Sequence, residues 1–238
     1  MDVKEVAIKE MLIVTDGQSN VGVDPQIAAK DAFNQGIIVN TIGIVNEDTK
    51  NEDSLVEIVK IAEAGGGIYE YTYIDNLHQT LQSVTYRTVN KTLKETVNRQ
   101  LKELIGEDMD NMTPDSRGKF LQYVDKFTDE VLLQCCILLD VSGSMASKIM
   151  VARHSILDLV DSFKTRKGRV DLAVIVYPGS NGKDYELIHG FGDYINNLEK
   201  KLYDVKTRGA TPTGPAIYHG IEIIKAGRDI LELEEVTI

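Results

Sequence analysis

The sequence predicts one α/β domain with a doubly wound, mostly parallel central sheet and helices on both faces. Strand-like and helix-like segments alternate along the chain, which is typical of parallel strands joined by crossover helices. The strand-like segments are short apolar runs, as expected for strands that are buried on both faces. The chain has 238 residues, which is long enough to bury one sizeable core.

Three strands and three helices are predicted in the first third of the chain. The predicted strands are the apolar runs 11–15, 37–44 and 68–73. The first helix is expected after Asp24-Pro25, because aspartate caps helix N-termini and proline suits the first helical position, and it ends at Gly36. Ser54 and Glu57 have the spacing of a capping box, which predicts the start of the second helix.

Residues 86–131 differ from the rest because two helical patterns follow each other with no strand between them. The first has an apolar stripe from Val89 to Leu104, and the second begins at Thr113-Pro114, a cap followed by proline. The stripe spans too few heptads for a coiled coil. We therefore interpret this segment as a two-helix connector that docks on the domain.

The alternation resumes after the connector. Strands are predicted at 132–139, 170–177 and 185–188, and the last two are expected to pair through the turn at 178–183. Amphipathic helices are predicted near 149–163, 194–205 and 217–224. This part of the chain supplies the second half of the predicted sheet.

Composition and charge exclude several classes of function. A net charge of -11 leaves no cationic stripe for a phosphate backbone, so we expect no nucleic-acid partner. No apolar run has the length of a membrane span, and the charged start lacks the apolar core of a signal peptide. The two cysteines, Cys135 and Cys136, are adjacent in a predicted strand and point to opposite faces. We expect a cytoplasmic protein that does not insert into membranes.

Short oxygen-bearing side chains follow several of the predicted elements. Asp140, Ser142 and Ser144 come directly after one strand, Asp16 after another, and Thr211 lies in the loop before the last helix. Ligands of open parallel sheets bind at the carboxyl ends of the strands, near the switch point. Because all five candidates offer oxygen, they suit a hard cation, Mg²⁺ or Mn²⁺, and not zinc or copper.

Three segments carry a resemblance to a known family. They are Asp140-Val141-Ser142-Gly143-Ser144-Met145, Thr211-Pro212-Thr213-Gly214 and Thr15-Asp16-Gly17, and together they resemble the metal-ion-dependent adhesion site of von Willebrand factor type A domains. The resemblance covers about residues 11–84 and 132–228. It implies a Rossmann-like fold in which Ser142, Ser144 and Thr211 are hydroxyl ligands. The two carboxylates of such a site would be Asp140 and Asp16.

The order of the halves departs from the family, where the Asp-x-Ser-x-Ser strand comes first. The chain therefore resembles a circularly permuted domain, with the C-terminal half at 1–85, the connector at 86–131 and the N-terminal half at 132–238. In the family's sheet order, the strand before Asp140 lies beside the strand before Asp16. The chain is also similar to the YabS-like proteins of spore-forming bacteria, which have this inverted arrangement, and that suggests a sporulation setting.

The leading functional hypothesis is a binding module that grips a Glu or Asp of a partner protein through the cation, without covalent chemistry. Loop residues near the site are expected to contact the partner, namely Gln18, Ser19, Asn20, Met145, Arg208 and Pro212. We favour a monomer over a half-swapped dimer, because the connector is long enough to return to the central strand.

Two alternatives stay open. The first is a Mg²⁺-dependent phosphoryl-transfer enzyme in which Asp140 attacks, although Ser142 stands where such enzymes carry a second carboxylate. The second is a metal-free scaffold that works through the connector helices. The enzyme is the runner-up to the binding module, because the usual acid or base is missing, and we do not expect catalytic activity.

Overall fold

The structure is a computed structural model that describes residues 7–45, 52–105 and 109–235. Six strands form one sheet in the order β3-β2-β1-β4-β5-β6. The strands are β1 (Ala7–Thr15), β2 (Ile37–Val45), β3 (Gly66–Tyr73), β4 (Leu132–Asp140), β5 (Val170–Tyr177) and β6 (Glu186–His189). All neighbours pair in parallel except β5 and β6, which confirms the predicted mostly parallel sheet.

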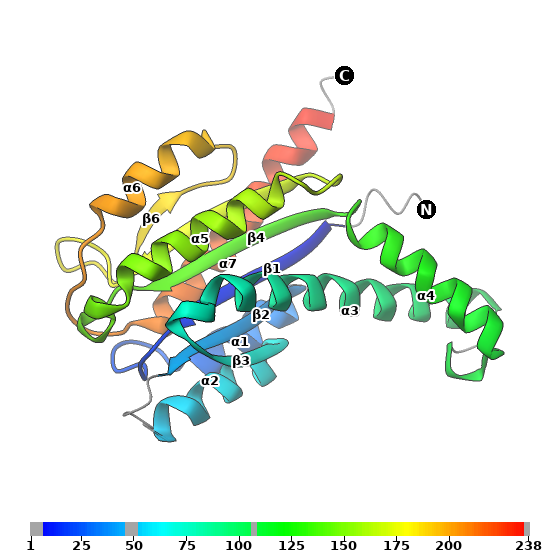
Figure 1. The fold of residues 1–238 in the computed structure, drawn as a ribbon, viewed down its shortest axis with the longest axis horizontal. Helices are drawn as coiled ribbons and strands as arrows, with labels where there is room; N and C mark the ends of the chain where they lie inside the picture. The colour runs from blue at the N-terminus through cyan, green and yellow to red at the C-terminus, as the bar shows by residue number, and fades with distance from the viewer. Residues whose placement is uncertain (1–6, 46–51, 106–108, 236–238) are drawn as a thin grey trace.

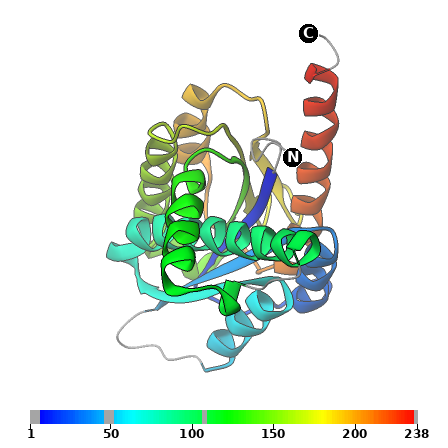
Figure 2. The ribbon, with the colours of Figure 1, turned by 90° about the vertical axis from the view of Figure 1, so that its right-hand side faces the viewer.

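The helices form a layer on each face of the sheet. They are α1 (Pro25–Asn34), α2 (Glu52–Ala64), α3 (Leu77–Ile105), α4 (Pro114–Thr128), α5 (Ile149–Phe163), α6 (Leu198–Asp204) and α7 (Thr213–Glu235). One face is covered by α1, α2 and α7, and the other by α3, α5 and α6, with the sheet between the two layers in Figure 2. The predicted doubly wound fold is confirmed. Although α3 has 29 residues, no helix in the described ranges is apolar enough over a sufficient length to cross a membrane.

Alternate side chains of the central strands belong to two hydrophobic cores, one on each face of the sheet. In β1, Leu12 and Val14 belong to the core under α3 and α5, while Met11 and Ile13 belong to the core under α1 and α7. Strand side chains alternate between faces, so a strand covered on both sides needs an unbroken apolar run. Each such fully buried side chain contributes about 1.5–3 kcal/mol to stability.

Two of the predicted helix caps are confirmed, and the capping box is wrong. Asp24 accepts a hydrogen bond from the Gln26 amide at the start of α1, and the predicted cap before α4 is also formed. However, α2 already begins at Glu52, which places Ser54 inside the helix with a buried hydroxyl that has no hydrogen-bond partner among the residues that the structure describes. The carboxylate of Glu57 accepts instead from the Ser19 amide at 2.8 Å, a distant loop that the sequence spacing does not reveal.

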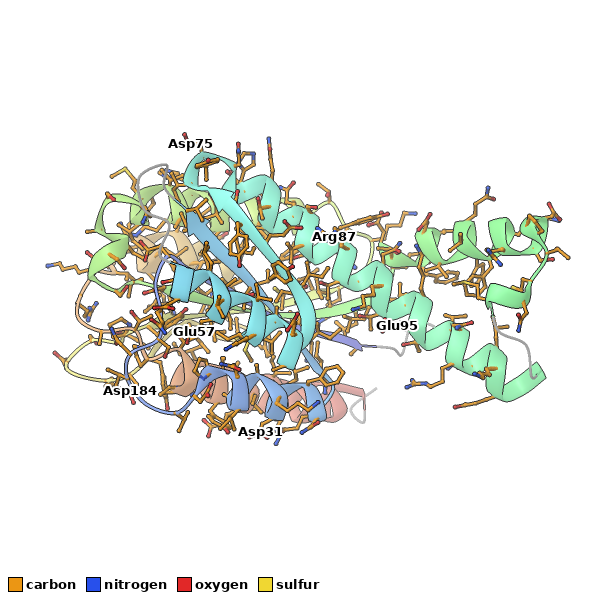
Figure 3. All side chains as sticks on the ribbon, turned by 90° about the horizontal axis from the view of Figure 1, so that it is seen from below. Asp31, Glu57, Asp75, Arg87, Glu95 and Asp184 are labelled. Carbon is orange, nitrogen blue, oxygen red and sulfur yellow. The ribbon has the colours of Figure 1, made fainter. Side chains whose placement is uncertain are left out.

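The connector is continuous with the helix before it. One helix, α3, runs from Leu77 to Ile105, so no break exists at the boundary predicted near residue 86. Its first part packs on the sheet, and its second part extends beyond the sheet together with α4, as Figure 3 shows. The two helices are tied by Asn90, whose side-chain amide donates to Asp125 at 2.7 Å. Continuity follows from the sequence, because no glycine or proline interrupts this helix.

Candidate functional site

The candidate site lies where β1 and β4 end side by side. These central strands pair in parallel register up to Val14 and Leu139, so the residues that follow them leave the same edge of the sheet together. The chain passes from β1 outward to β3 and then returns to β4, which makes this pair the switch point of the sheet. In Figure 1 the loops after β1 and β4 and the loop before α7 gather at one end, opposite the α3–α4 extension.

Asp140 forms the buried base of the site. Its side chain is fully buried, and it accepts hydrogen bonds from the Thr15 hydroxyl at 2.6 Å and from the Ser142 amide at 2.7 Å. The pKa of Asp140 is raised to about 6, chiefly by burial and to a smaller extent by the nearby Asp16 charge, against the lowering effect of the Thr15 and Ser142 hydrogen bonds. Both carboxylate oxygens are therefore engaged by neighbours that orient them.

A chain of hydroxyls joins the β4 loop to the β1 loop. The hydroxyls of Ser142 and Ser144 lie 3.1 Å apart, and Ser144 donates to Asp16 at 2.6 Å. The short 3₁₀ helix Gly143–Ser147 positions Ser144, which is exposed, whereas Ser142 is buried. The tertiary fold thus brings Asp16, Ser142 and Ser144 together in one polar cluster that opens to solvent at Ser144.

Lys148 is a charged member of the site that sequence reasoning missed. Its ammonium group donates to Asp16 in an ion pair, and the side chains of the two residues are only 10% and 1% exposed, respectively. The sequence gives no local signal for this residue, because the turn that begins before Ser144 is a 3₁₀ helix, in which side chains three positions apart, and not four, share a face. The carboxylate of Asp16 consequently contacts both a hydroxyl and a cationic side chain.

Thr211 is held next to the β1 loop through its backbone. Its amide donates to the Asn20 side chain at 2.9 Å, and its carbonyl accepts from the Asn20 amide at 3.2 Å and from the Ser19 hydroxyl at 3.1 Å. The Arg208 amide donates to the Val141 carbonyl at 2.8 Å, which ties the same loop to the end of β4. Among the described residues, the Thr211 hydroxyl makes no hydrogen bond to the other four candidate ligands.

The predicted partner-contacting residues divide into accessible and inaccessible ones. Gln18 and Asn20 are exposed, and Ser19 and Arg208 are partly exposed, so these four are available to a partner. Met145 and Pro212 are both buried, so their side chains are not accessible to a partner in this structure. Met145 points into the core under α5 because the 3₁₀ turn directs it inward. Pro212 lies directly before α7, and its carbonyl accepts from the Ala216 amide at the start of that helix.

A second carboxylate that the sequence did not assign supports the β1 loop. Glu57 of α2 holds the Ser19 amide, as described above. Partial burial raises the pKa of Glu57, the hydrogen bond from the Ser19 amide lowers it, and the charge of Asp24 raises it. Through this contact α2 fixes the position of the loop that carries Asp16 and Asn20.

The donor set decides which kind of ion the residues could hold. Within the described ranges, no group of three or more His, Cys, Asp or Glu side chains is arranged to hold a metal ion. The cluster instead offers two carboxylates and hydroxyl groups, all of them oxygen donors. Such donors suit Mg²⁺ or Mn²⁺ and give no affinity advantage to soft metals. The residues present therefore fit a hard divalent cation, with Lys148 as a competing positive charge.

Comparison with known proteins identifies the relatives of the chain. No protein-family model matches it. A likeness to proximal thread matrix protein 1 of the mussel byssus has 16% identity and a TM-score of 0.28, covers 85% of this chain and 43% of that one, and is too weak to support an argument. The solved structure of an uncharacterized protein from Alicyclobacillus acidocaldarius has 35% identity and a TM-score of 0.90, and it covers 96% of this chain and 98% of that one.

A relative from Bacillus subtilis shows which family the chain belongs to. The uncharacterized protein YabS of strain 168 is 35% identical over 233 residues, which cover 96% of this chain and 95% of that protein. Near-complete coverage of both chains means that the connector is shared as well as the sheet. The predicted similarity to the YabS-like proteins is confirmed, and the chain belongs to the YabS family.

Proposed function

We propose that this chain is a divalent-cation-dependent protein-binding module, a von Willebrand factor type A domain with permuted halves that captures a Glu or Asp of a partner protein. One observation carries the proposal. Asp16 and Ser144, 128 positions apart in sequence, are joined by a hydrogen bond at the switch point of the sheet, where ligands of this fold class bind. The neighbouring Ser142 and Asp140 extend this cluster of oxygens.

The chain's own residues would hold the cation in two ways. Ser142, Ser144 and Thr211 would offer hydroxyl oxygens, while Asp140 and Asp16 would orient those groups and balance charge. Mg²⁺ or Mn²⁺ held mostly by neutral oxygens supplies a positive charge that a partner carboxylate can approach. The fully buried position of Asp140 supports an orienting role, because neither of its oxygens is free of neighbours.

The same burial argues against the phosphoryl-transfer alternative. A nucleophilic carboxylate must reach a phosphorus atom, yet Asp140 is 0% exposed and accepts hydrogen bonds on both oxygens. The second position of the motif is Ser142, which cannot act as the acid or base of such a reaction at neutral pH. We therefore propose a binding function without covalent chemistry.

A hollow beside the cluster would give the partner additional contact area. Its volume is about 460 Å³, and it is lined by the loop from Gln18 to Gln26 together with residues of α2. Val21, Val23 and Val56 are 43%, 48% and 48% exposed there, so the rim offers apolar side chains. A single carboxylate contact gives modest affinity, and burial of these side chains would raise it.

The proposal also includes a closed monomer. In the sheet, β1 lies between β2 and β4 of the same chain. The helices α3 and α4 connect the first half of the chain to the second. This arrangement needs no second copy to complete the cluster of Asp16, Ser142 and Ser144. It supports the monomer over a dimer that exchanges halves.

Binding of Mn²⁺, followed by electron paramagnetic resonance, tests the proposal. The intact protein is expected to bind one Mn²⁺ that Mg²⁺ displaces, and Ser144→Ala is expected to weaken binding at least about tenfold, since it removes a ligand and a contact to Asp16. Ser147→Ala, a change in the same turn at an exposed residue, is the matched control. Equal Mn²⁺ binding by the intact protein and by Ser144→Ala would contradict the assignment.

A further inference from the structure

We propose that Lys148 sets the charge of the site: it weakens binding of the divalent cation and strengthens capture of a carboxylate by the loaded site. The inference rests on the proposed function, because it concerns the same cluster. It starts from the ion pair between Lys148 and Asp16, whose side chains are 10% and 1% exposed. An ion pair so far from water exerts a stronger field than a surface pair, since solvent screens it less.

The contacts of Asp16 explain why Lys148 affects the cation. One oxygen of this carboxylate accepts from the Ser144 hydroxyl, and the other accepts from the Lys148 ammonium group. Each oxygen of Asp16 therefore already accepts from one donor, and the Lys148 ammonium group competes with a cation for the charge of this carboxylate. Lys148 thus keeps Asp16 in an orienting role and leaves neutral hydroxyls as the nearest oxygen donors.

The formal charges predict opposite effects on cation and anion. Asp16 and Asp140 contribute -2 and Lys148 contributes +1, so the site carries -1 before the cation and +1 after it. Without Lys148 the same two states would carry -2 and 0. The loaded site therefore attracts a carboxylate more strongly while Lys148 is present, and the empty site attracts the cation more strongly when Lys148 is absent.

If the ion pair has only a structural role, removal of Lys148 changes the two binding affinities in a different way. If Lys148 only held the start of α5 against the β1 loop, its removal would disturb the positions of Asp16 and Ser144. The affinities for the cation and for the carboxylate would then both fall. The opposed changes therefore separate an electrostatic role from a structural one. Asp16→Asn with Lys148→Met keeps the charge of the site at -1 and removes both partners of the ion pair together, which provides a folded reference should Lys148→Met alone be unstable.

The experiment measures Mn²⁺ binding by titration calorimetry and acetate binding to the Mn²⁺-loaded protein by water-proton relaxation. Lys148→Met and Lys148→Gln are expected to bind Mn²⁺ at least about tenfold more tightly and acetate at least about tenfold more weakly. Lys148→Arg and the double variant are expected to stay within about twofold of the intact protein. Lys164→Met, which removes an exposed ion pair with Asp161, is the matched control.

The outcomes separate this inference from the proposed function. Unchanged or weaker Mn²⁺ binding by both Lys148→Met and Lys148→Gln, with normal binding by the intact protein, overturns the role of Lys148 and leaves the metal site standing. Mn²⁺ binding by these variants but not by the intact protein supports the role of Lys148 and overturns cation-dependent capture by the natural sequence. No Mn²⁺ binding by any form overturns both.

Discussion

Thr15 donates a hydrogen bond of 2.6 Å to Asp140, a residue 125 positions away in the sequence. The contact joins the ends of β1 and β4, which belong to the first and second halves of the chain. It satisfies an oxygen of a fully buried carboxylate. The relationship shows that the site depends on both halves, and it leads to the first prediction.

Thr15→Val is expected to lower the free energy of unfolding by about 1–3 kcal/mol, because it removes a donor from a buried carboxylate while keeping the side-chain shape. Thr165→Val removes a hydrogen bond from an exposed hydroxyl and is expected to cost less than about 0.5 kcal/mol. Urea denaturation of the two variants measures the difference. Equal losses would mean that the Thr15 contact does not support Asp140.

Mg²⁺ is expected to raise the unfolding temperature, since a cation that binds the folded site and not the unfolded chain stabilises the fold. At a concentration of 100 times Kd the gain is about 2.7 kcal/mol. Asp16→Asn is expected to lose most of this gain, because it removes half of the carboxylate charge of the cluster. Differential scanning calorimetry with and without EDTA measures the gain, and a full gain in Asp16→Asn would exclude this aspartate from the site.

Glu10 predicts a dependence of stability on pH that is separate from the metal site. This residue of β1 is fully buried and accepts from the Asn40 side chain at 2.8 Å. Burial raises the pKa of Glu10 from 4.5 to about 8, although the Asn40 hydrogen bond lowers it. Between these values the unfolded chain has released the proton and the folded chain retains it, so stability falls as pH rises.

Glu10→Gln removes this proton difference and keeps the contact with Asn40 possible. The variant is expected to be about 1–3 kcal/mol more stable than the intact protein at pH 8, and the advantage is expected to shrink toward pH 4.5. Glu95→Gln, whose side chain is 66% exposed, is expected to leave the pH profile unchanged. Urea denaturation across this pH range tests the prediction, which fails if both variants follow the profile of the intact protein.

Mixing two variants with weakened cation binding tests the closed monomer. Asp16→Asn carries its change in the first half and Ser144→Ala in the second, so only an exchange of halves can place two intact segments together. We expect no recovery of Mn²⁺ binding after the variants are unfolded and refolded together. Recovery of binding, with a dimer in light scattering, would instead show a swapped assembly.

Local chemistry determined much of this protein from the sequence. The apolar runs predicted the central strands β1, β2, β4 and β5, because a strand covered on both faces cannot carry polar residues along most of its length. Asp24 and Thr113 were predicted as caps, since a cap depends on groups two or three residues away. The oxygen-bearing residues Asp16 and Asp140 were singled out because they follow strands whose carboxyl ends share one edge of the sheet.

The tertiary structure alone decided which distant groups meet. It directs Glu57 to the Ser19 amide instead of to its own helix, turns Met145 into the core, and pairs Lys148 with Asp16. No local pattern encodes these contacts, because each one depends on how helices and loops from different parts of the chain pack around the sheet. The sequence by itself determined the kinds of groups at the site, and packing determined their partners, their burial and therefore the charge that a ligand would meet.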